Sequence, residues 1–224
     1  MEKHLSYPGH PKFEPQKWNK NKYIKHSHNC YTYALNTIIK KNAKTCKKYS
    51  NLSRKRRRTI KKRQQKKCRK KLDTWEWCDY HRPDKCFLLR PQPGIHSKTI
   101  KKYNKKNHKS NMDKLSRMIL RDNPGIKKLK KNQKCPMGYY RIYLMPTFHA
   151  KYRRGDYHFI RQDRSGRWSE KWGDGAAKKI KEKTPEKYLK NLKKLFSSGS
   201  IFEGRYFAVP IKEKRNLKNL WKNF

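Results

Sequence analysis

Acidic residues are scarce in this chain. Its 224 residues include 16 Asp+Glu against 63 Lys+Arg, which gives a formal net charge of +47 at pH 7. The stretch from Lys40 to Lys71 contains no acidic residue at all. Self-repulsion on this scale opposes compaction unless negative charge comes from outside the chain. A merely solvated surface would suit a net charge of about 2–8, so the imbalance predicts an anionic partner.

Long apolar runs are also missing. No run approaches the roughly 20 apolar residues of a membrane span, so we expect no transmembrane segment. The start, "MEKHLSYPGH", lacks the apolar core of a signal peptide. We therefore expect a protein of the cytoplasm, the nucleus or a virion assembled there, not a secreted one. In such compartments the cysteines are expected as reduced thiols or metal ligands, although an extracellular particle would permit a disulfide. The cysteines are Cys30, Cys46, Cys68, Cys78, Cys86 and Cys135.

Apolar residues make up 33% of the chain, against about 45–50% in ordinary globular proteins. Aromatic residues make up 12%, and their large buried area still allows a core. The length predicts one domain. We expect an extended N-terminal arm over residues 1–24, a single domain over 25–210 with a basic insertion at about 42–74, and a basic tail over 211–224.

The order of the predicted elements indicates an α+β fold. Asn29 is a plausible N-cap for a helix whose apolar stripe runs from Tyr31 to Ile39 and which closes at Lys40 and Lys41. The antiparallel strands expected after it give an α+β domain. We predict strands at 138–145, 156–163, 167–172 and 204–210, helices at 111–120 and 184–196, and a turn or rigid connector at 90–94.

The predicted strands at 156–163 and 167–172 are expected to form a hairpin. "DRSG" suits a turn with Gly166 in the left-handed conformation. If Asp163 pairs with Arg167, then Ile160 pairs with Glu170, and Glu170 becomes the diagonal neighbour of His158 on one sheet face. A one-residue change of register would move Glu170 to the other face.

Cys30 directly follows the predicted N-cap. A helix N-terminus stabilises thiolate and lowers the pKa of a cysteine, and nearby cations act in the same direction. A nucleophile also needs a base and a group that orients the base, and His158 and Glu170 are the candidates. The alternative is that Cys30 is a small buried hydrophobic residue.

Several segments, in this order, resemble a family of papain-like cysteine hydrolase domains akin to the NlpC-type cell-wall peptidases. They are "NCYTYALN", "PQPG", "DYHFIRQD" with "SG" and "WSEKWG" after it, and "YFAVP". The resemblance covers most of the chain except residues 42–80 and the two ends. It implies a papain-like fold in which the helix carrying Cys30 packs on an antiparallel sheet, with Cys30 and His158 as the catalytic pair.

This chain departs from the family pattern at the third position. That position is usually histidine, whereas here it is Glu170, and Trp172 replaces a proline two residues later. A carboxylate can orient an imidazole, so activity and its loss are both compatible with the pattern.

We expect no metal site. Cys68, Cys78, His81 and Cys86 are only weak zinc candidates, because they include a single C-x2-H pair and a zinc site usually has four ligands with tight pairs. Separate thiols or one disulfide are the favoured interpretation of these cysteines. We interpret His26, His28 and Asn29 as solvated polar residues at the helix entrance, with metal ligation as the alternative. We expect no cofactor.

The basic segment is the strongest signal. Its cations can bind nucleic-acid phosphates without sequence specificity, or they can bind acidic proteins. They can also bind an anionic membrane surface or serve as a nuclear-localisation signal. Trp75 and Trp77 could stack on bases or pack in a strand. The predicted polyanion-binding residues are Arg54, Lys55, Arg56, Arg57, Arg58, Lys61, Lys62, Arg63, Lys66, Lys67, Arg69, Lys70 and Lys71.

Two hypotheses follow. The abundance of Lys, Asn and Ile resembles proteins of large DNA viruses of eukaryotes, so the first is a basic structural (capsid-type) protein on a papain-like scaffold. Its partners would be acidic protein surfaces of an assembly, DNA or RNA phosphates, or anionic lipid. The second is an active cysteine peptidase or amidase, with Cys30 as nucleophile, His158 as base and Glu170 as the orienting group.

Overall fold

The structure is a computed structural model. It describes residues 9–60, 62–63, 86, 89–94, 96–97, 108–149, 154–196, 203–213, 215 and 217. The segment with Trp75 and Trp77 and most of the predicted C-terminal tail lie outside these residues.

A six-stranded sheet in the order β1-β6-β2-β3-β4-β5 forms the centre of the molecule, and every neighbouring pair of strands is antiparallel. The predicted α+β class is therefore confirmed. The two edge strands, β1 and β5, have three residues each. The strands are β1 (Lys127–Leu129), β2 (Tyr139–His149), β3 (Arg154–Gln162), β4 (Trp168–Lys171), β5 (Ala177–Lys179) and β6 (Arg205–Pro210).

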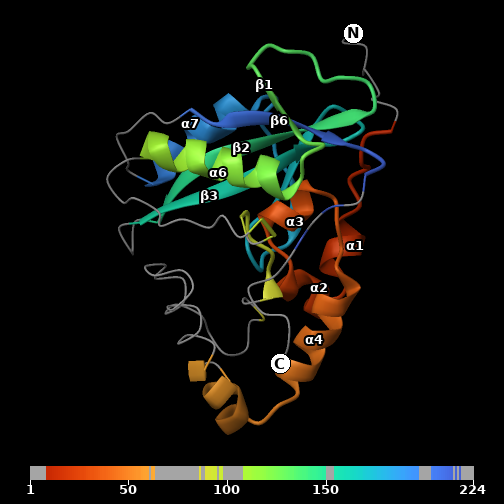
Figure 1. Cartoon of the computed structure of the whole chain (residues 1–224), viewed down its shortest axis with the longest axis vertical. Helices are drawn as coiled ribbons and strands as arrows, with labels where there is room; N and C mark the ends of the chain where they lie inside the picture. The colour runs from red at the N-terminus through yellow and green to blue at the C-terminus, as the bar shows by residue number, and fades with distance from the viewer. Residues whose placement is uncertain are drawn as a thin grey trace.

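Helices cover both faces of the sheet. Alternate residues of each strand point to opposite faces; Ile142 and Phe159 join one core cluster, while Tyr143 and Ile160 join another. The first cluster contains residues of α3 (Cys30–Ala34) and α6 (His108–Asp122), and Figure 1 shows α6 in front of β2 and β3. The second contains residues of α7 (Pro185–Phe196).

A second group of helices lies beyond the sheet (Figure 1): α1 (Pro15–Asn19), α2 (Lys22–Ser27) and α4 (Lys40–Ser50). The predicted extended arm is therefore wrong over 15–24, which forms α1 and the start of α2. Trp18 explains why, because its ring is buried against Tyr33 at a centroid distance of 5.0 Å. Burial of the Trp18 side chain stabilises α1, because a helix this short would not be stable in isolation.

The helix predicted from Asn29 to Lys41 is interrupted. It ends at Ala34, Asn36 takes a left-handed φ of 49°, and Lys40 opens α4 instead of closing the first helix. The buried Arg161 guanidinium stabilises this break, because its Nη1 donates to Tyr33 O (3.1 Å) and Asn36 Oδ1 (2.9 Å). The Tyr33 carbonyl in the last turn of α3 thus accepts from a side chain of β3.

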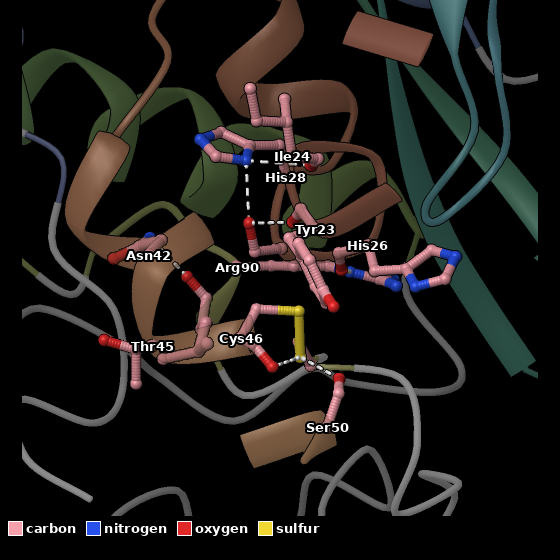
Figure 2. Close-up of a disulfide and its surroundings, with 12 residues drawn as sticks. Tyr23, Ile24, His26, His28, Asn42, Thr45, Cys46, Ser50 and Arg90 are labelled. Atoms are coloured by element: carbon pink, nitrogen blue, oxygen red, sulfur yellow. Dashed lines mark hydrogen bonds between the residues drawn. A yellow bond between two sulfur atoms is a disulfide. The ribbon is translucent and has the colours of Figure 1, made fainter. Parts of the chain in front are cut away.

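The predicted basic insertion also begins inside a packed helix. Asn42, Cys46 and Tyr49 of α4 are buried, and the Asn42 amide donates to Leu89 O at 2.7 Å. Cys46 forms a disulfide with Cys86, with the two Cα atoms 5.3 Å apart (Figure 2). The insertion is therefore part of the core up to Ser50, and a covalent bond joins α4 to the chain 40 residues later.

The remaining predicted elements are present with shifted ends. Helix α6 is longer than predicted at both ends, and α7 begins at Pro185 after Thr184, whose hydroxyl accepts from Lys187 N at 3.3 Å. Strands β1 and β5 were missed. No helix within the described part of the chain has the length and hydropathy to cross a membrane.

Candidate functional site

His158 and Glu170 form a buried pair on the α7 face of the sheet. The predicted register is present: Asp163 N donates to Arg167 O, Gly166 has a φ of 75°, and Ile160 pairs with Glu170. His158 Nε2 lies 3.0 Å from Glu170 Oε2, and each side chain is 1% exposed. The local turn chemistry thus brings these two predicted site residues into contact.

The environment favours a neutral imidazole beside a carboxylate. Burial lowers the pKa of His158, although Glu170 acts in the opposite direction. Burial alone would raise the pKa of the Glu170 carboxyl, but the hydrogen bonds from His158 and Tyr188 and the charge of Lys178 outweigh it and lower this pKa. Since a carboxylate can only accept, Nε2 of His158 carries the proton.

Other side chains enclose the pair. Tyr188 of α7 donates to Glu170 Oε2 at 2.5 Å, and the exposed Lys178 of β5 lies 3.3 Å from Glu170 Oε1. Trp172 stacks on the His158 ring, with centroids 3.7 Å apart and planes only 6° from parallel. Trp172 therefore covers one face of the candidate base.

Cys30 is the first residue of α3, as predicted. Asn29 caps this helix in a capping box: Thr32 N donates to its side chain (3.2 Å), and Asn29 N donates to Thr32 Oγ1 (2.9 Å). Cys30 is 7% exposed and belongs to the same cluster as Tyr157 and Phe159. Because His158 lies between these two residues on β3, its side chain points to the opposite face of the sheet from Cys30.

Two buried cations lie near Cys30. Arg90 donates through Nε to His26 O (2.9 Å), and Lys171 Nζ donates to the carbonyls of Lys25 (2.8 Å), His28 (2.8 Å) and Gly173 (2.6 Å). Burial lowers the pKa of Arg90 to about 10 and that of Lys171 to about 7, while charge on Cys30 acts to raise both. A Cys30 thiolate would therefore be stabilised by these cations.

His28 and Asn29 are buried, which corrects their interpretation as solvated residues. His28 Nε2 accepts from Ile39 N at 2.8 Å. On the other side of the ring, Nδ1 lies 2.9 Å from Ile24 O (Figure 2). Asn29 donates to Pro91 O at 2.9 Å, which fastens the "PQPG" segment over α3. Both side chains therefore serve local packing.

The zinc candidates do not assemble within the described chain. Cys86 is in the disulfide, so the expectation of a reduced thiol or metal ligand is wrong for Cys46 and Cys86, and the single-disulfide alternative fits them. Cys68, Cys78 and His81 lie outside the described residues. Among the described residues, no three His, Cys, Asp or Glu side chains cluster as a metal site would require.

The described half of the predicted polyanion-binding segment is helical over 54–60 and at 62–63. Arg57 is half-buried and donates to Ser50 O at 2.8 Å, whereas its charged neighbours are exposed. Lys61, Lys66, Lys67, Arg69, Lys70 and Lys71 lie outside the described residues. The exposed cations are Arg54, Lys55, Arg56, Arg58, Lys62 and Arg63, and those of α4 are Lys40, Lys41, Lys44, Lys47 and Lys48.

Sequence reasoning missed several residues around the candidate site. Tyr188 lies in the predicted helix 184–196, and the signal that could have found it is that a tyrosine on the buried side of a helix carries a hydroxyl that needs a partner. Nothing in the sequence marks Lys171 as a buried residue, because a lysine in a strand is ordinarily expected at the surface. Arg90 next to "PQPG" was likewise read only as part of a connector.

Comparisons of the chain with models of protein families, with curated proteins and with solved structures find no match. The arrangement of these side chains is therefore the basis for any functional conclusion.

Proposed function

We propose that this chain is a basic structural protein of the virion type, in which a papain-like scaffold serves as a rigid block and exposed basic helices bind acidic protein surfaces or nucleic acid. One observation carries the proposal: α4 and the described residues 54–60 and 62–63 expose many cations, and these stretches contain no acidic residue. Self-repulsion on such a surface opposes the compact state, and a bound polyanion would neutralise it.

The state of the candidate triad supports a structural role. A hydrolase needs a nucleophile and a base within hydrogen-bond reach of each other and of a substrate. Here His158 and Glu170 are 1% exposed under Tyr188 and Trp172, while Cys30 belongs to the core cluster on the other face of the sheet. Such an arrangement suits a packed core better than turnover.

Retention on immobilised heparin tests the proposal, because heparin is a polyanion without base or protein chemistry. We expect the protein to remain bound at physiological salt and to elute only well above it, and to co-sediment stoichiometrically with large anionic assemblies. Elution below physiological salt would overturn the proposal.

A cysteine hydrolase is the second candidate, favoured by Arg90 and Lys171 beside Cys30. Iodoacetamide labelling at pH 7, followed by mass spectrometry, separates the two. A structural role predicts that Cys30 labels no faster than half-buried Cys135, whose pKa burial raises to about 11. Fast labelling of Cys30 that is lost in His158→Gln would support the hydrolase instead.

A further inference from the structure

The basic surface is built on a two-helix unit with a defined inner side. Cys46 and Tyr49 of α4 pack with Leu52, Ile60 and the disulfide partner Cys86. The Tyr49 hydroxyl donates to Arg57 O at 3.4 Å, and Ser53 Oγ accepts from Arg56 N at 3.3 Å as the second helix begins. We call α4 together with residues 51–60 and 62–63 the basic hairpin; its apolar side faces inward and its cations face outward.

We propose that the basic hairpin binds the phosphate backbone of double-stranded nucleic acid. The inference rests on the proposed function and names its partner. Lys41, Lys44 and Lys48 follow one face of α4, three to four residues apart, and span about 10 Å at the helical rise of roughly 1.5 Å per residue. Duplex DNA carries one negative charge per about 1.7 Å of its axis, which supplies a phosphate for each of these lysines.

Acidic proteins match the hairpin less well. A soluble protein surface, even an acidic one, usually carries cations interspersed among its anions. Such a surface would place cations against an outward face that is uniformly positive. A polymer of evenly spaced phosphates has no such mismatch.

An anionic membrane also matches less well. A helix that lies in a membrane interface buries its apolar side among the lipid chains. The apolar side of α4 is already occupied, because Cys46 is fully buried and Tyr49 is 6% exposed. Only the charged side remains for a lipid surface.

A duplex also fits better than a single strand. Proteins that bind single strands without sequence preference stack the bases on exposed aromatic rings. Within the described residues of the basic hairpin, Tyr49 is the aromatic residue, and it is buried. Backbone binding without stacking or base reading is what remains.

The test is fluorescence anisotropy with a 30-base-pair DNA duplex of arbitrary sequence, the matching single strand, poly-glutamate and phosphatidylserine vesicles, each at 50–200 mM salt. The first variant changes Lys41, Lys44, Lys47 and Lys48 to Gln. A matched control changes Lys128, Lys130, Lys181 and Lys187 to Gln, which are equally exposed and remove the same charge elsewhere. Gln has nearly the helix propensity of Lys, so both variants should fold.

We expect the wild-type chain to prefer the duplex. The hairpin variant should bind at least about tenfold more weakly at 100 mM salt, with a salt slope smaller by about 3, because each of the phosphate contacts of Lys41, Lys44 and Lys48 contributes about 0.9 to the slope. The control should keep most of the slope.

Equal losses in both variants, or a preference for single strands, vesicles or poly-glutamate, would overturn the duplex assignment and leave polyanion binding standing. Failure to bind heparin as well as all four probes would overturn the proposed function itself.

Discussion

Arg161 shows how a single charged residue organises this core. Its side chain is fully buried, it forms an ion pair with Asp163 Oδ1 at 3.0 Å, and its guanidinium lies 4.4 Å from the centre of the Tyr33 ring. The same group donates to the last turn of α3. Arginine suits this position because its planar group offers five donors in fixed directions.

Replacing Arg161 by Gln should therefore destabilise the protein by about 3–5 kcal/mol, because Asp163 would be left as a buried charge without its partner. Urea unfolding followed by circular dichroism measures the change. As a control, the double variant Arg161→Met with Asp163→Leu should recover part of the loss, since removing both charges spares their desolvation. A loss below about 1 kcal/mol in Arg161→Gln would contradict the role given to this pair.

His28 makes the stability depend on pH. Burial, helped by the charges of Lys171 and Arg90, lowers the pKa of His28 to about 4 from 6.5. Nε2 accepts from Ile39 N, so protonation there would set two N–H groups against each other. Because the unfolded chain binds this proton at higher pH, the contribution of His28 to stability is present above pH 6.5 and is lost as pH falls towards 4.

We expect the free energy of unfolding to fall by about 3 kcal/mol through His28 over this interval, at about 1.36 kcal/mol per pKa unit. The measurement is urea unfolding at several pH values between 4 and 7. In His28→Gln the profile should be flatter, although a slope from His158 and His10, whose pKa values burial also lowers, remains. An unchanged profile in this variant would contradict the prediction.

At the scale of elements, the disulfide joins α4 to the residue that follows the basic segment. Closing a loop of 40 residues restricts the unfolded chain and stabilises the fold by about 2–4 kcal/mol. The double variant Cys46→Ser with Cys86→Ser should lower the denaturant midpoint accordingly, and a reducing agent should do the same to the wild-type protein. If reduction leaves the midpoint of the wild-type protein unchanged, the bond does not form in solution.

Elements whose signals are local could be predicted from the sequence. The β3–β4 hairpin follows from "DRSG", in which only a residue such as Gly166 tolerates the left-handed turn position. Its register then determined the contact of His158 with Glu170. Helix α7 likewise carries its own start, Thr184 followed by Pro185.

Elements that depend on distant partners could not be predicted. The apolar stripe continues from Tyr31 through Ile39, so no local residue signals that the helix ends at Ala34. Arg161, 125 positions beyond Asn36, stabilises this helix end. The pairing of Cys46 with Cys86 and the burial of Lys171 are also long-range outcomes. The opposite placement of Cys30 and His158 follows from how α3 packs on the sheet, which spacing alone does not determine.

At the scale of the whole molecule, the net charge of +47 should make stability depend on ionic strength. Screening weakens repulsion between exposed charges, with a Debye length of about 30 Å at 0.01 M salt and about 8 Å at 0.15 M. We expect the melting temperature to rise by several degrees between these conditions, and further when duplex DNA is added at low salt, because a ligand of the native state stabilises it. A melting temperature that falls with salt and ignores DNA would contradict this expectation.

The short edge strands β1 and β5 affect whether two copies can pair through their sheets. If several copies bound one polyanion, their charges would be neutralised and they would no longer repel one another. Long exposed sheet edges could then pair with each other. With three residues each and two exposed lysines apiece, Lys127 and Lys128 on one edge and Lys178 and Lys179 on the other, these borders offer too few free backbone groups for that. Short edges that carry lysines protect the sheet against edge-to-edge pairing of two copies.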